Sequence, residues 1–151
     1  MTFYQVLLLA HVLGVILWLG GSVANTLLLA RARSTGSQDI LTTQVANGRW
    51  LDLRMGMPAA LVVLFAGGWL MAEGDWPFDT AIWIHIGMAA LIAAAVIGIV
   101  WTGRFQRRLL AGGHSSSGLA ALSSRILLGN AASIALILIG LWAMIAKPSV
   151  G

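Results

Sequence analysis

The sequence predicts an all-α integral membrane protein, a four-helix bundle that runs up, down, up and down through the bilayer. Composition is the first observation: the 151 residues are 59% hydrophobic and only 9% charged, with a mean hydropathy of +0.90. A soluble domain carries about 25% charged residues, and a soluble fold of this length could not bury so much apolar surface. The second observation is four apolar segments of about 20 residues, the length that spans a bilayer. The third is that most charged side chains lie between those segments.

The apolar segments define the predicted spans, and the whole chain, 1–151, is expected to form one membrane domain. The spans are expected at residues 3–30, 55–72, 80–103 and 126–146. Ser37 is predicted to cap a helix that runs toward the second span, and Pro58 to kink that helix or begin its membrane portion. A Gly-Asp-Trp-Pro run within 73–79 predicts a tight turn. The Gly/Ser-rich stretch 112–118 predicts a flexible loop.

Loop charges predict the orientation of the bundle. One end is expected to collect eight arginines: Arg31, Arg33, Arg49, Arg54, Arg104, Arg107, Arg108 and Arg125. The other end is acidic with one lysine: Glu73, Asp75, Asp79 and Lys147. Basic loops stay on the cytoplasmic side, so we expect a multi-pass protein of the bacterial inner membrane with both termini in the periplasm. The net charge of +4 therefore reports topology, and no nucleic-acid partner is expected.

Two helix faces carry polar and small residues at spacings of three and four. On the first span they are His11, Gly14, Trp18, Gly21 and Asn25. On the fourth they are Asn130, Ser133, Ile137, Gly140 and Met144. Polar groups in lipid need partners, so both faces are expected to point inward. The simplest interpretation is close helix packing over the glycines, with hydrogen bonds between the polar side chains.

Two histidines lie within spans, where an ionisable side chain is a candidate functional residue. At 1.5 Å per residue, His11 and His85 lie at depths of roughly 12 Å and 8 Å, in one layer near the periplasmic side. Their helices are diagonal in such a bundle, and two imidazoles with an iron between them would span that gap. The geometry predicts haem b between these two histidines. Met144 is a lesser candidate for the second axial position, and Gly14 and Trp18 are candidate cofactor contacts.

Other interpretations of the histidines stay open. In the simplest one, each imidazole only hydrogen-bonds a backbone carbonyl or a neighbouring polar side chain. Copper is the rival metal, because imidazole and thioether suit Cu(I), with Met88 or Met144 as a third ligand. Zinc lacks an obvious third nitrogen or oxygen ligand. His114 falls in the Gly/Ser loop and is expected to be solvated. The chain has no cysteine, and no Walker loop, dinucleotide fingerprint or HExxH motif.

Several short motifs resemble the HemJ-type protoporphyrinogen oxidases and the related membrane domain of copper-resistance protein D. The likeness covers nearly the whole chain. It begins with the run from His11 to Gly21 and continues through Arg49-Trp50, Met57-Pro58, Gly67-Gly68, the run from Trp83 to Ile86, Gly103-Arg104, and Arg125 with Asn130. The resemblance implies a four-helix membrane fold, haem b, oxidoreductase activity and a porphyrin or quinone partner. It also implies that His11 matches the essential first-helix histidine of the HemJ type.

The sequence departs from the HemJ pattern in two places. Gly87 stands where those enzymes carry a lysine after the third-helix tryptophan, and Asn-Glu-x-Pro is replaced by a run beginning Gly129-Asn130. The closing segment from Trp142 to Pro148 is more similar to an uncharacterised family of small four-helix membrane proteins in the same superfamily. Fold and haem binding are therefore expected more than the oxidase reaction.

Three functions follow from these observations. The leading one is a haem b-binding membrane protein with a redox or haem-handling role. The second is a copper-handling membrane protein. The third is a cofactor-free accessory subunit of a larger membrane complex, because the chain is small and its helices are rich in glycine and alanine. A homo-oligomer is compatible with each.

Overall fold

The computed structural model describes residues 1–73 and 81–147. Within these ranges the regular structure is helical throughout, without strands. Four continuous helical segments are long and apolar enough to cross a membrane: Phe3–Ser34, Gln38–Glu73, Ile82–Leu110 and Ser116–Ala146. This confirms the predicted all-α four-helix membrane bundle. The turn predicted around Asp75, Trp76 and Asp79 lies outside the described residues.

The two middle segments differ from the outer two because each contains a π-helical turn. The first and last segments are the uninterrupted helices α1 (Phe3–Ser34) and α6 (Ser116–Ala146). The second segment consists of α2 (Gln38–Leu51), the π turn η1 (Asp52–Gly56) and α3 (Met57–Glu73). The third consists of α4 (Ile82–Val96), the π turn η2 (Ile97–Thr102) and α5 (Gly103–Leu110).

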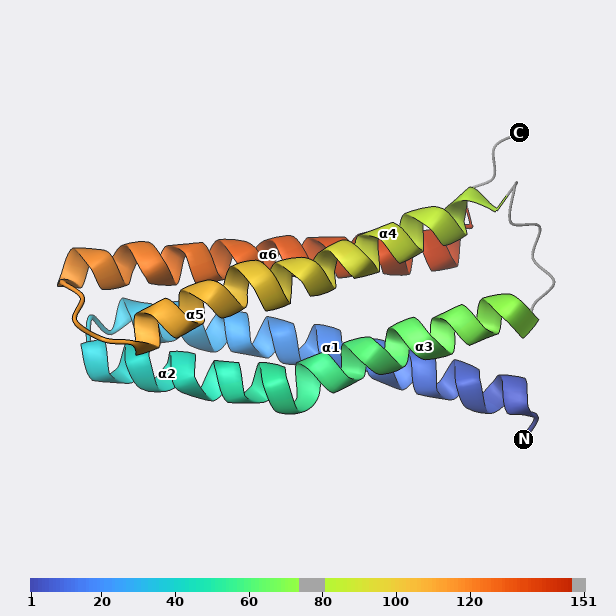
Figure 1. Cartoon of the computed structure of the whole chain (residues 1–151), viewed down its shortest axis with the longest axis horizontal. Helices are drawn as coiled ribbons and strands as arrows, with labels where there is room; N and C mark the ends of the chain where they lie inside the picture. The colour runs from blue at the N-terminus through green and yellow to red at the C-terminus, as the bar shows by residue number, and fades with distance from the viewer. Residues whose placement is uncertain (74–80, 148–151) are drawn as a thin grey trace.

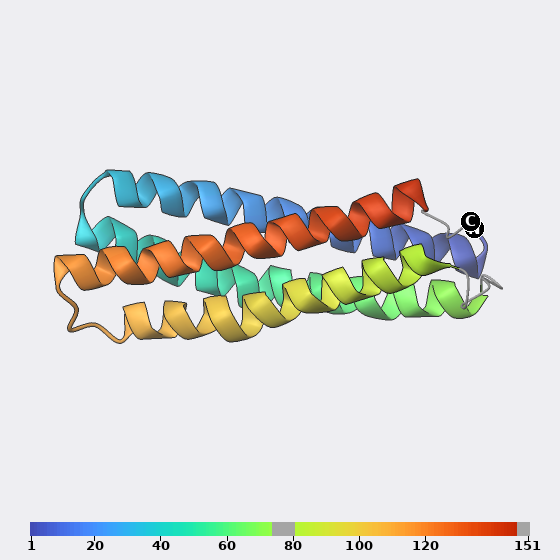
Figure 2. The ribbon, with the colours of Figure 1, turned by 90° about the horizontal axis from the view of Figure 1, so that it is seen from above.

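Successive segments run antiparallel, so the start of α1 and the end of α6 lie at one end of the bundle (Figure 1). We call this the terminal end, and the opposite end, with the α1–α2 and α5–α6 loops, the arginine end. The most extensive contacts join α1 to α3 and α4 to α6, while α3 and α4 touch only slightly. Figure 2 shows α6 crossing α1 at an angle, and the two helices pack against each other. The bundle is therefore two helix pairs joined along the α1–α6 seam.

Side-chain caps account for where the helices begin. Ser37 accepts a hydrogen bond from the Ile40 N–H and starts α2, which confirms the predicted cap. Ser115 accepts one from the Gly118 N–H, so α6 begins at Ser116. Part of the predicted flexible loop is consequently helical, and α6 starts well before the apolar run at residue 126. Sequence composition favoured a loop there because serine and glycine are also turn residues.

The helices are longer than a bilayer requires, and the excess lies at the arginine end. The segments contain 29 to 36 residues, whereas about 20 cross the hydrocarbon core. Beyond that depth the helices continue around their own apolar core, formed by Leu29, Ala32, Leu41, Val45, Phe105, Leu109, Leu119 and Ile126. A second core lies nearer the terminal end: Trp18, Ala59, Ala60, Val63, Leu91, Ala94 and Ile137.

The π turn η1 explains how Pro58 fits into a continuous helix. A proline lacks the backbone N–H, and its ring clashes with the carbonyl four residues earlier, here that of Arg54. In η1 the helix is widened, and the Met57 N–H bonds to the Asp52 carbonyl five residues back. Widened turns of this kind accommodate such disturbances. The expected effect of Pro58 is therefore found, as a π turn that separates α2 from α3.

Candidate functional site

His11 lies half-buried on α1 and faces α3. Its Nδ1 is 2.9 Å from the Val63 carbonyl oxygen, so Nδ1–H donates to that oxygen and Nε2 carries the lone pair. Gly67, one turn further along α3, makes room for the ring: a Cβ there would lie 2.9 Å from His11 Cε1 and 3.0 Å from Nδ1. The sequence of α3 thus fixes both the position and the tautomer of the imidazole.

The other predicted cofactor residues lie in different parts of the bundle. His85 is exposed on α4. Met144 packs between α6 and α4, with its Cε 3.0 Å from the position of a Cβ on Gly87. Gly14 lets α1 approach α3 closely, because a Cβ there would lie 2.8 Å from Val63 Cγ2. Of these residues, Gly14 shares the α1–α3 seam with His11, whereas Met144 does not.

Metal-binding side chains do not cluster in the described part of the chain. No group of three or more His, Asp or Glu side chains comes close enough to hold an ion there, and the sequence has no cysteine. His114 Nε2 lies 2.8 Å from the Arg108 carbonyl oxygen, so this histidine serves the α5–α6 connection.

A second group of polar residues surrounds Asp52 where α2 meets η1. Its Oδ2 accepts a hydrogen bond of 2.8 Å from Gln106 Nε2. Its Oδ1 lies 3.5 Å from Asn25 Nδ2, and Asn25 Oδ1 lies 3.5 Å from Gln44 Nε2. Gly48 permits this arrangement, because its backbone packs directly on the Asn25 amide. Amide donors from α1 and α5 thus converge on one carboxylate.

Two further polar side chains close to Asp52 have no hydrogen-bond partner. Thr102 Oγ1 and Asn130 Nδ2 are buried and unpaired within the described structure. Thr102 is 2% exposed and Asn130 8%. A buried polar group without a partner costs about 1–3 kcal/mol, and native proteins rarely leave one without a reason. A water molecule or a ligand with complementary groups would complete the hydrogen bonding of both side chains.

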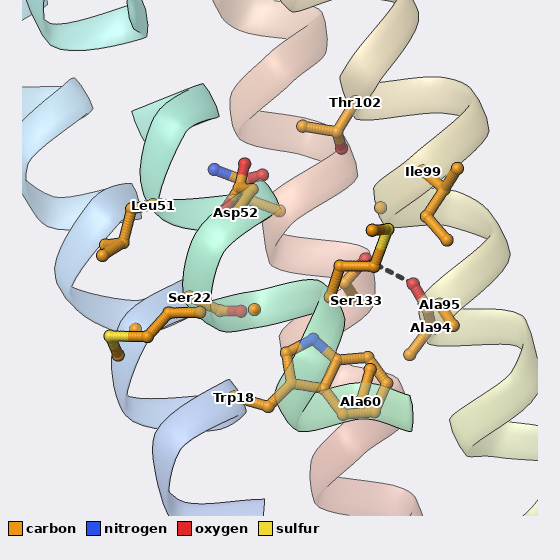
Figure 3. Close-up of a pocket in the computed structure, with 16 residues that line it drawn as sticks. Trp18, Ser22, Leu51, Asp52, Ala60, Ala94, Ala95, Ile99, Thr102 and Ser133 are labelled. Atoms are coloured by element: carbon orange, nitrogen blue, oxygen red, sulfur yellow. Dashed lines mark hydrogen bonds between the residues drawn. The ribbon is translucent and has the colours of Figure 1, made fainter. Parts of the chain in front are cut away.

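Asp52, Thr102 and Asn130 line one cavity, which is shown in Figure 3. It lies between the two π turns, so both helix irregularities face the same space. Its volume is about 80 Å³. The polar part of its wall consists of Trp18, Ser22, Asp52, Thr102, Asn130 and Ser133. Ser133 Oγ donates to the Ala94 carbonyl oxygen at 3.2 Å, the dashed line in Figure 3. The cavity contains neither His11 nor His85.

Sequence reasoning found part of this cavity and missed its centre. Trp18, Asn130 and Ser133 lay on the predicted inward faces, although they were interpreted mainly as packing. Asp52 was missed because it sits between Arg49 and Arg54 and resembled an ordinary loop charge. Thr102 was missed because no pattern in sequence reveals a π turn. The one available signal was a lone carboxylate a few residues before a membrane proline.

The fold and the cavity together define a small four-helix integral membrane protein with a polar internal site. The chain belongs to the DUF2269 family, described as predicted integral membrane proteins, whose family model matches residues 5–148. No curated protein and no solved structure matches the chain. The family match establishes the membrane character, while the likeness to HemJ-type oxidases stays a prediction.

Proposed function

We propose that this protein binds haem b through His11 and has a redox or haem-handling role in the membrane. The observation that carries the proposal is the hydrogen bond from His11 Nδ1–H to the Val63 carbonyl. Histidines that bind a metal through one ring nitrogen almost always donate the other N–H to such an acceptor. The bond fixes the ring orientation and leaves Nε2 as the ligand atom, as a haem iron requires.

The surroundings of His11 fit one axial ligand. The ring is only partly buried and rests against the backbone of α3 at Gly67, where a Cβ would lie 2.9 Å from its Cε1. Val63 itself is fully buried, and its backbone belongs to the packed α1–α3 seam. A rigid acceptor behind a partly accessible imidazole is a suitable base for a cofactor ligand.

His85 is the proposed second ligand, and its support is weaker. It lies at a similar depth to His11, but it is exposed on α4 rather than directed into the packed interior. We therefore expect His11 to contribute more than His85 to the affinity for haem. A bound haem would supply one-electron chemistry at a potential set by its axial ligands. The chain itself would hold the haem, orient it and shield it from water.

The test is a haem titration of the purified full-length protein, followed by absorbance. Wild type should bind haem with a sharp Soret band at a fixed stoichiometry. His11→Ala should weaken binding by tenfold or more, and His85→Ala by less. His114→Ala is the matched control, because that imidazole lies at the arginine end and bonds the Arg108 carbonyl of α5, and it should bind as wild type does.

Other outcomes identify the alternatives. Copper, and no iron, in metal analysis of protein from copper-supplemented cells would support a copper-handling protein. A colourless, metal-free protein that copurifies with other membrane subunits would support an accessory role. Equal haem affinity of the His11→Ala and His114→Ala proteins would contradict the proposal.

A further inference from the structure

We propose that the cavity between η1 and η2 binds the head group of a quinone-class molecule that enters from the lipid. This inference does not rest on haem binding, because the cavity and His11 lie in different parts of the bundle. It rests on the unpaired polar groups, the position of the cavity mouth and the small residues of its wall.

The unpaired groups specify what the ligand must offer. Asn130 Nδ2 only donates and so needs an acceptor, while the Thr102 hydroxyl can either donate or accept. The nitrogen edge of the Trp18 indole also faces the centre of the cavity in Figure 3, and an indole N–H only donates. A molecule with carbonyl oxygens satisfies these donors. A cation would not satisfy this site, because the unpaired Asn130 amide presents N–H hydrogens and not a lone pair.

Asp52 supplies the complementary acceptor. Gln106 and Asn25 occupy part of its hydrogen-bonding capacity, but a carboxylate has about four lone-pair sites. The remaining sites accept from a hydroxyl group. A ligand that presents carbonyls in one redox form and hydroxyls in the other matches a wall with donors and one carboxylate. Quinones and quinols have this pair of forms.

The mouth of the cavity is positioned for a lipid-soluble ligand. Among the residues that line the cavity, Met55, Met57 and Ile99 are apolar and 36%, 40% and 56% exposed, so we infer that the cavity opens to lipid on their side. At 1.5 Å per residue, Met57 and Ile99 lie about 25 Å from the terminal end, inside a hydrocarbon core of about 30 Å. Asp52 and Thr102 lie about 30 Å from that end, near the boundary. A polar head would therefore sit at the boundary with its tail in lipid.

The wall explains why a flat head is favoured. Ala60, Ala94, Ala95 and Gly98 line the cavity from both helix pairs. Small residues on opposite sides leave a narrow space suited to the edge of a planar ring. The cavity volume of about 80 Å³ accommodates that polar edge, and the rest of the ring would lie at the exposed side of the cavity, where flexible methionines adapt to it.

The experiment is calorimetric titration of the detergent-purified full chain with decylubiquinone, together with thermal unfolding. Thr102→Val removes the unpaired hydroxyl and keeps the shape. It should weaken binding about tenfold, the loss of one good hydrogen bond. Because the hydroxyl has no partner in the unliganded protein, the Tm of the unliganded variant should equal or exceed that of wild type. Asn130→Leu should behave in the same way, and it serves if Thr102→Val expresses poorly.

Two controls complete the design. Thr43→Val changes an exposed threonine on α2, far from the cavity, and should bind as wild type does. His11→Ala should also retain quinone binding, which separates this proposal from the haem proposal. Lack of saturable binding by wild type, or equal affinity in Thr102→Val and Thr43→Val, would overturn the inference and leave a cavity of ordered water. A lower unliganded Tm for both Thr102→Val and Asn130→Leu would also overturn it, because the two groups would then have structural partners.

Discussion

At the scale of single residues, glycines decide how close the functional side chains come to their partners. Gly67 admits the His11 ring, Gly48 admits the Asn25 amide, and Gly129 admits the Thr102 side chain. In each case a Cβ would meet the side chain or its polar atom. Other helical glycines, such as Gly20 and Gly68, have nothing within 4 Å of a Cβ. The same residue type therefore has a positional role at some sites and none at others.

The contrast between Gly67 and Gly68 on α3 predicts different effects for an alanine at each position. In Gly67→Ala the new methyl group would lie 2.9 Å from His11 Cε1, so the ring must move and its bond to Val63 weakens. We expect a loss of about 1 kcal/mol in the free energy of unfolding, the value of one hydrogen bond. Gly68→Ala adds a methyl group in open space and should be neutral or slightly stabilising. Thermal unfolding in detergent measures both, and equal Tm values would contradict the described packing of His11.

At the scale of elements, the two π turns organise the cavity. Each lies in the middle of a long helical segment, and they face the same space from different helix pairs. A π turn adds one residue to a helical turn and so rotates everything beyond it. Pro58 gives η1 a cause in the sequence, whereas η2 has no proline. No residue in η2 explains its widened turn, and in the structure η2 packs against α6.

The contact between η2 and α6 predicts the effect of a larger residue at Gly129. Gly129 on α6 packs against η2, where its Cβ would contact the Thr102 hydroxyl and lie 2.7 Å from Trp101 Cδ1. Gly129→Ala must push η2 away from α6, so we expect a destabilisation of about 1–3 kcal/mol, typical of overpacking. Gly20→Ala on α1 is the control and should change stability little. If thermal unfolding gives both variants the same Tm, η2 does not approach α6 as described.

At the scale of the whole molecule, the bundle has a membrane part and an extension at the arginine end. Fold class, helix number and the Ser37 cap could be predicted from sequence, because apolar length and capping chemistry are local signals. The extension could be predicted only in part: the helix after Ser37 was expected and is present as α2, whereas the residues between Arg104 and Arg125 are polar enough to resemble a loop. The cavity depended on two π turns and on contacts between distant residues, which leave no periodic signal. His11 was selected as a candidate ligand because a histidine inside a span is unusual, and that role stays a prediction.

The charge distribution predicts the orientation, and the cysteine-free chain makes that easy to test. We expect the arginine end in the cytoplasm and the terminal end in the periplasm. Gln38→Cys, at the start of α2, should be shielded from a membrane-impermeant thiol reagent applied to intact bacterial cells. Glu73→Cys, at the end of α3, should react with it. Both side chains are exposed, so the reverse labelling pattern would contradict this orientation.

The most direct test of the central claim is the absorption spectrum of the protein as purified from haem-replete cells. We predict a Soret band in wild type and His114→Ala that is strongly reduced in His11→Ala. A folded wild-type protein without that band, which also fails to acquire it when haem is added, would contradict the account.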